Sequence, residues 1–276
     1  MDDFRELVLL LTPLYGEGEA HSLASIVFED VFGRKRAARE ALQPEERVRL
    51  QPIAARLAAG EPLQYVLGEA DFFGMKLRVG PDVLIPRQET EELVAWAIAH
   101  LRNLKNDRPR VLDIGTGSGC IALAIQKQFT SAEVMALDVS ESALDVARQN
   151  ARLLGLPVQC RQGDILSPDG WPDGSFDLII SNPPYVLPSE AVHMPVWVKA
   201  HEPGLALFVP ENDPLLFYRV LCERAPACLS PEGALLVEVS AFHARQVTEL
   251  FEKAPFRTVL CKNDLSGMPR MVGGFV

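Results

Sequence analysis

Hydrophobic residues in the first 68 positions recur at the spacing of amphipathic helices. The pattern runs through Phe4–Leu14, Leu23–Phe32 and Val48–Ala59, where apolar side chains return every three or four residues. Pro44 is typical of a helix start and Gly60 of a helix end. The pattern therefore predicts a small N-terminal helical domain, residues 1–68, suited to docking a substrate or to packing.

The period changes in residues 69–86, which we interpret as a β-hairpin linker. Phe72–Val79 reads as one strand, a Gly-Pro-Asp turn follows at residues 80–82, and Val83–Ile85 supplies a second short run. The charged stretch Pro86–Glu92 then opens a helix that continues to Leu101. Taken alone, this stretch is equally well explained as an ordinary charged helix start.

Strands alternate with helices from Arg110 onward, which predicts an open, mostly parallel sheet with helices on both faces. Residues 87–276 are therefore expected to form a Rossmann-like α/β domain. The expected strands are Arg110–Ile114, Glu133–Leu137, Val158–Gln162, Phe176–Ile180, Ala234–Val239, and a final pair near Arg257–Lys262 and Met268–Phe275. The expected helices lie near Cys120–Phe129, Ala143–Leu154, Pro214–Ala227 and Ala244–Lys253.

Composition and charge exclude several classes of function. The chain has 276 residues and a net charge of −10, which argues against a duplex nucleic acid as substrate, because phosphate binding requires clustered Lys and Arg. The acidic N-terminus and the lack of a long apolar run predict a cytoplasmic protein without a membrane span. Five scattered cysteines without a C-x-x-C pair, and scattered histidines, predict neither disulfides nor a metal site.

The stretch Phe176–Tyr185 carries the first candidate chemistry. An apolar run typical of a buried strand stops at Asn182, Pro183, Pro184 and Tyr185. The prolines stiffen the backbone, the Asn182 side chain and the Pro183 carbonyl offer acceptors, and Tyr185 offers an aromatic face. These four residues, called the clamp below, are suited to binding a planar group that carries NH2, such as an amide or an exocyclic amine.

A simpler explanation of the same residues is a stiff loop that ends a strand. Because the chain contains 21 prolines, about one or two Pro-Pro pairs are expected by chance at ordinary proline frequencies. The Pro-Pro pair is therefore evidence for a binding site only if neighbouring residues in the fold also point to one.

A glycine-rich loop follows the first strand of the α/β domain. Asp113–Gly119 contains Gly115, Thr116, Gly117, Ser118 and Gly119, and a helix begins directly after it. Dinucleotide-binding proteins place the third glycine one position later, where this chain has Cys120. The spacing therefore favours a cofactor without phosphates over a dinucleotide, although a purely structural turn would carry the same glycines.

Acidic and apolar residues at the next two strand ends are suited to binding a nucleoside. Asp138 ends the second strand, where a carboxylate can accept from both hydroxyls of a ribose. Asp164 and Ile165 follow the third strand, where an adenine could lodge. Because all these residues and Asn182 lie at carboxyl ends of strands, the combination predicts S-adenosylmethionine as cofactor and methyl transfer as reaction.

Further motifs extend this pattern along nearly the whole chain. They are Gly60–Tyr65, Gly68 with Phe72–Gly74, Leu84–Arg87 with Glu89–Glu91, Asp113–Gly119, Ser181–Tyr185, Glu202 and Pro203 with Ala206 and Leu207, and Asp264–Gly267 with Arg270. With these motifs the chain resembles the HemK/PrmC family of peptide chain release factor glutamine N5-methyltransferases. Many class I methyltransferases share the glycine loop, whereas the Pro-Arg-x-Glu-Thr-Glu stretch joined to Asn-Pro-Pro-Tyr is more specific.

The resemblance implies a helical N-terminal domain, a hairpin and a class I methyltransferase domain acting on the glutamine of the Gly-Gly-Gln motif in class 1 release factors. It implies that Gly115–Gly119, Asp138, Ile165 and Asn182 contact the cofactor and that Asn182–Tyr185 hold the substrate glutamine. The chain departs from the family at Gln88, at Phe208–Pro210 and at Ser240. These departures concern loop shape and partner fit more than chemistry.

Two other functions are compatible with parts of the pattern. An adenine-N6 or cytosine-N4 methyltransferase acting on nucleic acid could use the same clamp for a flipped base, although the acidic charge counts against it. A non-catalytic module that only binds cofactor and partner would keep the glycine loop but would not need the clamp. The loop from Val186 to Pro214 is expected to cover the substrate.

Overall fold

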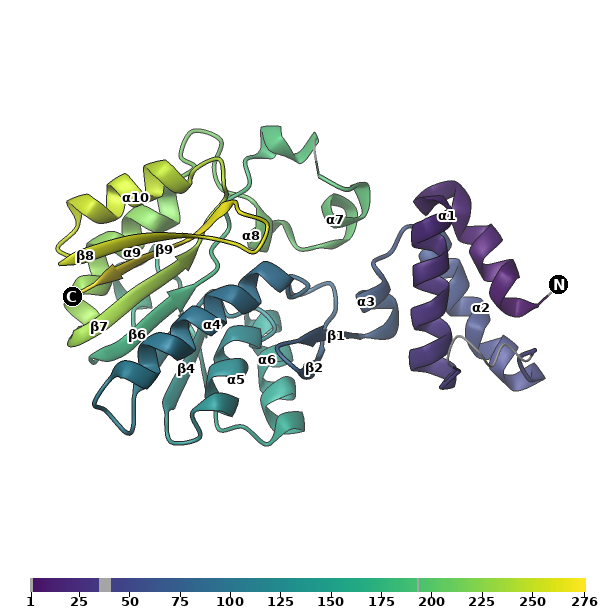
Figure 1. Ribbon diagram of the computed structural model, residues 1–276, viewed down its shortest axis with the longest axis horizontal. Helices are drawn as coiled ribbons and strands as arrows, with labels where there is room; N and C mark the ends of the chain where they lie inside the picture. Colours follow the sequence, from purple (N-terminus) through teal and green to yellow (C-terminus); the bar gives the residue numbers. More distant parts are fainter. Residues whose placement is uncertain (1, 35–40, 193) are drawn as a thin grey trace. The chain divides into compact units, whose positions relative to one another are not determined.

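The computed structural model describes residues 2–34, 41–192 and 194–276, and the chain divides into two compact units (Figure 1). The first unit comprises Met1–Gly68 together with Pro195–His201. The second comprises Glu69–Met194 and Glu202–Val276. The grouping of Pro195–His201 with the N-terminal residues was not predicted, because this segment lies within the loop that was expected to cover the substrate.

The first unit is helical. Its helices are α1 (Asp3–Phe32), α2 (Pro44–Ala58), α3 (Leu63–Leu67) and α7 (Val196–His201). The two helices expected before residue 33 form one element with a kink at Gly16, where φ is 77° and a glycine avoids the strain of a side chain. Helix α3 was not predicted, since five residues are too few to show a helical period.

Apolar residues of the first three helices close a core of their own. Phe4, Leu11, Val27, Leu57 and Val66 are among its buried members. Because this core is separate from the two cores of the second unit, the helical unit has the buried apolar centre that a compact domain requires.

The hairpin of the second unit lies earlier in the chain than predicted. Strand β1 (Glu69–Phe72) pairs antiparallel with β2 (Met75–Arg78), and Phe72 lies opposite Met75. Phe73 and Gly74 make the turn with φ values of 47° and 69°, as a two-residue hairpin turn requires. The turn expected at residues 80–82 is present, since the Val83 backbone N–H donates to the Gly80 carbonyl at 3.1 Å, but the strand expected after it at Val83–Ile85 was wrong. The hairpin turn itself was missed, because it is set by backbone angles that Phe73 gives no reason to expect.

The remaining strands of the second unit form one sheet. They are β3 (Arg110–Ile114), β4 (Glu133–Asp138), β5 (Gln159–Gln162), β6 (Phe176–Ser181), β7 (Leu229–Glu238), β8 (Thr258–Asn263) and β9 (Pro269–Phe275). Their order is β5-β4-β3-β6-β7-β9-β8, with only β9 running antiparallel to its neighbours β7 and β8. The prediction of a mostly parallel sheet is confirmed.

Helices cover both faces of this sheet (Figure 1). Helices α4 (Gln88–Asn103), α5 (Cys120–Gln128) and α6 (Glu141–Leu154) pack on one face, and α9 (Leu216–Cys228) and α10 (Ala244–Lys253) on the other. Short helical turns occur at Pro168–Gly170, Pro188–Val192 and, as α8, Gly204–Leu207.

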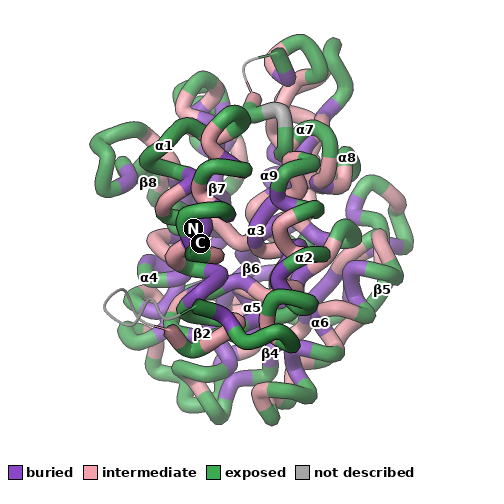
Figure 2. The backbone as a smooth tube through the Cα atoms, turned by 90° about the vertical axis from the view of Figure 1, so that its right-hand side faces the viewer, coloured by how far each residue is buried: buried purple, intermediate pink, exposed green. Residues whose placement is uncertain are grey.

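Alternate residues of the central strands supply the two cores. Leu178 and Ile180 of β6 belong to the core under α4 and α5, whereas Ile179 belongs to the core under α9 and α10. Both cores are fully excluded from water at these positions, and Figure 2 marks such buried residues in purple. Because both faces are covered, β6 reads as a continuous apolar run instead of an alternating one.

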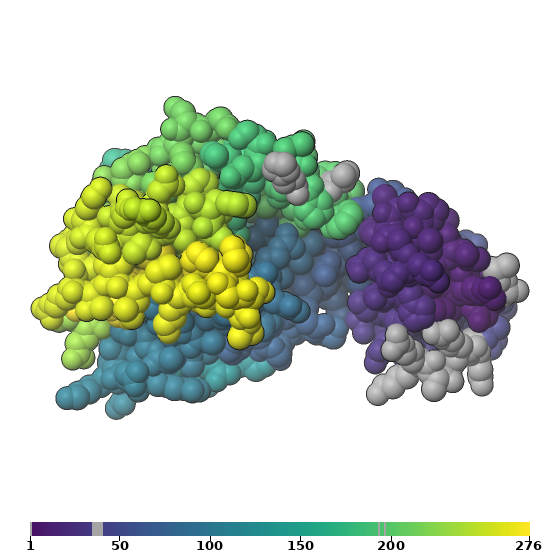
Figure 3. All heavy atoms as spheres, turned by 45° about the horizontal axis from the view of Figure 1, so that its top comes forward, coloured from purple at the N-terminus to yellow at the C-terminus, as the bar shows by residue number. Residues whose placement is uncertain are grey.

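The C-terminal hairpin β8–β9 contacts the start of the domain (Figure 3, yellow against blue). The Lys262 ammonium nitrogen lies 4.4 Å from the centroid of the Trp96 ring on α4, and Leu265 donates its backbone N–H to Glu92. Among the described residues, no helix combines the length and hydrophobicity needed to cross a membrane.

Candidate active site

The site lies where the strand order reverses. The chain runs from β3 outward through β4 to β5 and then returns to β6 on the other side of β3. Ile114, the last residue of β3, pairs with Ser181, the last residue of β6, and Ser181 donates its hydroxyl to the Ile114 carbonyl at 2.8 Å. Gly115 and Asn182 therefore leave the sheet side by side, at the point where open α/β sheets bind ligands.

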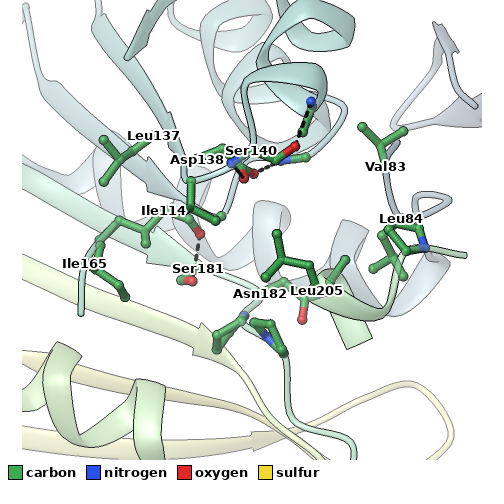
Figure 4. Close-up of a pocket in the computed structure, with 18 of the residues that line it drawn as sticks. Val83, Leu84, Ile114, Leu137, Asp138, Ser140, Ile165, Ser181, Asn182 and Leu205 are labelled. Carbon is green, nitrogen blue, oxygen red and sulfur yellow. Dashed lines mark hydrogen bonds between the residues drawn. The ribbon is translucent and has the colours of Figure 1, made fainter. Parts of the chain in front are cut away.

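A cavity of about 230 Å³ opens at this edge of the sheet (Figure 4). Figure 4 shows Ile114, Leu137 and Asp138 on one side of it, Val83 and Leu84 on another, and Asn182 following Ser181 at the end of β6. Ile165, Pro183, Pro184 and Leu205 also line it. Both candidate motifs, the glycine loop and the Asn-Pro-Pro-Tyr segment, thus contribute to one cavity.

The glycines of the loop have two different roles. Gly115 and Gly117 line the cavity with φ values of 70° and 54°, and a methyl group added to either would meet no atom within 4 Å. Gly119 also has positive φ, but an added methyl group would lie 3.1 Å from Leu123 and 3.2 Å from Ala147. Gly115 and Gly117 leave the backbone open to a ligand, whereas Gly119 allows the following helix to pack closely.

Two carboxyl groups hold the loop in place, the buried Asp113 and the half-buried Asp138. Asp113 accepts from the Thr116 hydroxyl at 2.6 Å and from the Ala122 backbone N–H at 3.1 Å. Burial raises the pKa of Asp113 to about 7, because a low-dielectric surrounding disfavours the charged form. Asp138 accepts from the backbone N–H groups of Gly117 and Ser140, each at 2.9 Å, and burial raises its pKa as well.

The Asn182 side chain is held from one side. Its Nδ2 group donates to the Thr90 hydroxyl at 3.1 Å, and the residue lines the cavity. Its amide nitrogen is therefore engaged with the protein, and its Oδ1 atom is the group that can accept from a ligand. The sequence-based expectation that this side chain lies beside the glycine-lined hollow agrees with the structure.

Tyr185 stands apart from the other three residues of the segment. Pro183 and Pro184 line the cavity, but Tyr185 does not. Its half-buried ring packs against the core under α9 and α10, and its hydroxyl donates to Glu238 at 3.3 Å. Burial raises the pKa of the Tyr185 phenol, so the ring stays neutral.

Thr90 and Glu238 are functional candidates that the sequence analysis did not name. Thr90, on α4, donates its hydroxyl to the Glu238 carboxylate at 2.6 Å, and both residues are almost fully buried. Glu238 ends β7 and contacts Thr90 across 148 positions of sequence. The available signals were the position of Thr90 in the Pro-Arg-x-Glu-Thr-Glu stretch and that of Glu238 near the carboxyl end of a predicted strand. Sequence alone cannot show what such residues face.

An ion pair between the buried Glu202 and the partly exposed Arg87 joins two walls of the cavity. Glu202 accepts from the Ile85 backbone N–H at 3.1 Å and from the Arg87 guanidinium at 2.5 Å. The wall Pro81–Leu84 precedes these two partners, and Pro203, Leu205 and Ala206 follow Glu202. The part of the expected covering loop that includes α8 therefore forms a wall of the cavity, whereas His193 of that loop lies outside the described residues.

The predicted site residues divide into two groups in the structure. Those that line the cavity are Gly115, Gly117, Asp138, Asp164, Ile165, Asn182, Pro183 and Pro184. Thr116, Ser118, Gly119 and Tyr185 do not line it, and Thr116 and Ser118 are buried beneath the loop. The second group belongs to the same two motifs but does not contribute to the surface of the cavity.

Two known protein families match the chain. The methyltransferase small domain matches residues 97–199, and the PrmC N-terminal domain matches residues 11–68. The first match covers β3 to β6 with the glycine loop and Asn182. The second covers most of the N-terminal helical residues.

Similar proteins span nearly the whole chain. It is 43% identical to a release factor glutamine methyltransferase of Bacteroides thetaiotaomicron over 81% of this chain and 79% of that protein. It is 38% identical to the protein of that name from Flavobacterium psychrophilum over 97% and 95% of the two chains. The crystal structure of a methyltransferase from Pyrococcus furiosus has a TM-score of 0.53 at 19% identity, covering 85% and 98%, and shares the fold.

Proposed function

The chain belongs to the release factor glutamine methyltransferases, and on that premise we propose its substrate, cofactor and working residues. It transfers a methyl group from S-adenosylmethionine to the side-chain amide nitrogen (N5) of the glutamine in the Gly-Gly-Gln motif of class 1 release factors. The observation that supports this proposal most directly is the single cavity lined by both the open glycines and Asn182.

The cavity residues fit a nucleoside cofactor. Gly115 and Gly117 leave the backbone open, and both carboxylate oxygens of Asp138 retain lone pairs for ribose hydroxyls after accepting one backbone N–H each. Ile165 and Leu137 supply apolar surface for a purine. S-adenosylmethionine, when bound, supplies an electrophilic methyl group carried on a positively charged sulfur.

The clamp residues address the weak reactivity of an amide nitrogen. The lone pair of that nitrogen is delocalised into the carbonyl, so its orientation and electron density must both be controlled. The Asn182 Oδ1 atom and the Pro183 carbonyl accept the two N–H bonds of the substrate amide, which fixes the nitrogen and increases its electron density. Once the nitrogen is methylated its proton is acidic and leaves to these acceptors or to water.

Tyr185 has a less direct role in this proposal. Its ring is expected to exclude water from one side of the substrate amide. Because its hydroxyl donates to Glu238, the ring is fixed by the same carboxylate that Thr90 contacts.

Three further expectations from the sequence stay predictions. They are the cytoplasmic location, the absence of a metal and the docking of the release factor by the helical unit.

The test is methyl transfer from labelled S-adenosylmethionine to a purified class 1 release factor. We expect one methyl group per chain, located by mass spectrometry on the glutamine of the Gly-Gly-Gln motif. A release factor with alanine in place of that glutamine is the matched control and should accept none. Labelling of DNA or RNA instead, or label on the alanine control, would contradict the proposal.

A further inference from the structure

We infer that Glu238 and Thr90 act as positioning residues that determine which way the Asn182 amide faces. The inference rests on the proposed function for its consequence, but the contacts that carry it are within the protein. Neither residue lines the cavity, so each acts on the substrate through other residues, and Asn182 is the cavity residue that Thr90 contacts.

The sheet register brings the three residues together. Ser181 of β6 pairs with Val237 of β7, so the next residues, Asn182 and Glu238, leave the two strands side by side. Thr90 lies in the first turn of α4. The following residues of this helix pack on the face of the sheet that α5 also covers. A strand pair and a helix start, distant in sequence, thus meet at one buried point.

The direction of the hydrogen bonds follows from the chemistry of the groups. An ionised carboxylate can only accept, and a threonine hydroxyl has a single hydrogen. At 2.6 Å from Glu238, that hydrogen belongs to the bond with the carboxylate. The Thr90 oxygen can then only accept from Asn182, 3.1 Å away, so the amide must turn its NH2 group toward Thr90.

The opposite orientation of Asn182 would prevent binding of a substrate amide. Rotation by half a turn would exchange Oδ1 and Nδ2 and would aim two N–H donors at the N–H donors of the substrate. It would also leave the Thr90 oxygen facing the Asn182 carbonyl without a hydrogen between them. A buried polar contact without a hydrogen bond is unfavourable. The chain of hydrogen bonds from Glu238 through Thr90 to Asn182, called the relay below, therefore selects the acceptor orientation of Asn182.

The surroundings of Glu238 make the relay sensitive to pH. The charged and titratable groups that act on its carboxyl are Arg270 of β9, Glu89 of α4 and the Tyr185 phenol, and the Tyr218 hydroxyl of α9 donates to its backbone carbonyl at 3.1 Å. Burial raises the pKa of Glu238, with Thr90, Arg270 and Tyr185 opposing the effect. Once protonated, Glu238 can donate to the Thr90 oxygen, and the fixed direction is lost.

Thr90→Val and Thr90→Ser test the hydroxyl, with methylation of the release factor as the assay. Valine has the same shape as threonine but lacks the hydroxyl oxygen. We expect kcat to fall about 10–100-fold, which is less than the fall caused by removing a group that contacts the transition state directly. Cofactor affinity should be unchanged. Serine should restore most of kcat. Thr248→Val on α10 removes a hydroxyl that donates to the Ala244 carbonyl, and serves as the control with wild-type kcat.

Glu238→Gln tests the carboxylate. A glutamine amide can donate or accept, so it no longer fixes the direction of the Thr90 hydroxyl. We expect wild-type kcat at saturating cofactor to fall as the pH is lowered and the variant to show a low kcat with a flat profile. Thermal unfolding of each variant separates loss of fold from loss of positioning.

A second measurement does not depend on activity. In the NMR spectrum, the side-chain NH2 protons of Asn182, assigned with Asn182→Asp, should exchange slowly with water in the wild type and Thr90→Ser and faster in Thr90→Val. Equal exchange in all three, or equal kcat in wild type and Thr90→Val, would overturn the inference. Absence of methylation by the wild type would contradict the proposed function instead, and the exchange rates would still decide the inference.

Discussion

The two halves of the site are held by different kinds of contact. The glycine loop is fixed by residues that are close in sequence, such as Asp113 with Thr116 and Gly117 with Asp138, three and 21 positions apart. The clamp is fixed by residues that are far apart. Asn182 contacts Thr90 across 92 positions and Thr90 contacts Glu238 across 148.

The two halves of the site therefore depend on different parts of the fold. The glycine loop is held by the ends of β3 and β4, so it can form a cofactor site once these two neighbouring strands and the helix after the loop have folded. A clamp held by α4, β6 and β7 together exists only when the whole sheet is assembled. We therefore expect changes in the loop to affect stability and cofactor affinity, and changes in the clamp to affect turnover.

The largest expected effect is on stability, from Asp113→Asn. Its carboxyl has a pKa of 3.8 as a free group and about 7 in the folded protein. Between these values folded Asp113 keeps a proton that the unfolded chain has released, so the free energy of unfolding falls as pH rises. Relative to the variant, the wild type should lose up to about 4 kcal/mol between pH 4 and pH 7, measured by urea unfolding.

The control for this experiment is Asp71→Asn, at an exposed position of the hairpin, which should keep the wild-type pH slope. If Asp113→Asn also keeps that slope, burial of this carboxyl does not stabilise its protonated form, and the account of the loop is wrong.

The next largest effect is on turnover, from Asn182→Ala. Loss of one acceptor for the substrate amide should lower kcat about 10²–10³-fold, the range found when one preorganised polar group is removed from an active site. Cofactor affinity, measured by calorimetry, should change far less. Unchanged kcat at saturating release factor would remove the clamp from the mechanism and with it the contrast between the two halves.

A smaller effect is expected from Glu202→Gln, which tests a long-range contact outside the clamp. The variant loses its charge-assisted bond to Arg87 but can still accept from the Ile85 N–H, so we expect a loss of about 1–3 kcal/mol. Arg245→Ala breaks an exposed pair with Glu249 and should cost less than about 0.5 kcal/mol. Equal unfolding midpoints for the two variants would show that the walls of the cavity do not depend on Glu202.

The sequence by itself determined the succession of strands and helices along the α/β domain and the identity of both motifs. Strand β3 was predicted at Arg110–Ile114, as observed, and the run Phe176–Ile180 differs from β6 by one residue. These predictions succeeded because hydrophobic period, glycine and proline act through the local backbone. The same reasoning placed Gly115, Asp138 and Asn182 at carboxyl ends of strands, and hence at one edge of the sheet.

Only the tertiary structure decided what those residues face. The hairpin turn at Phe73 and Gly74 depends on a positive φ at a phenylalanine, which local preference opposes. Thr90 and Glu238 looked like an ordinary helix start and strand end until the register of β6 with β7 placed Glu238 beside Asn182. Periodicity shows whether a side chain is buried, but the partner of a buried polar group is set by strand order and helix packing, which join positions that no local pattern connects.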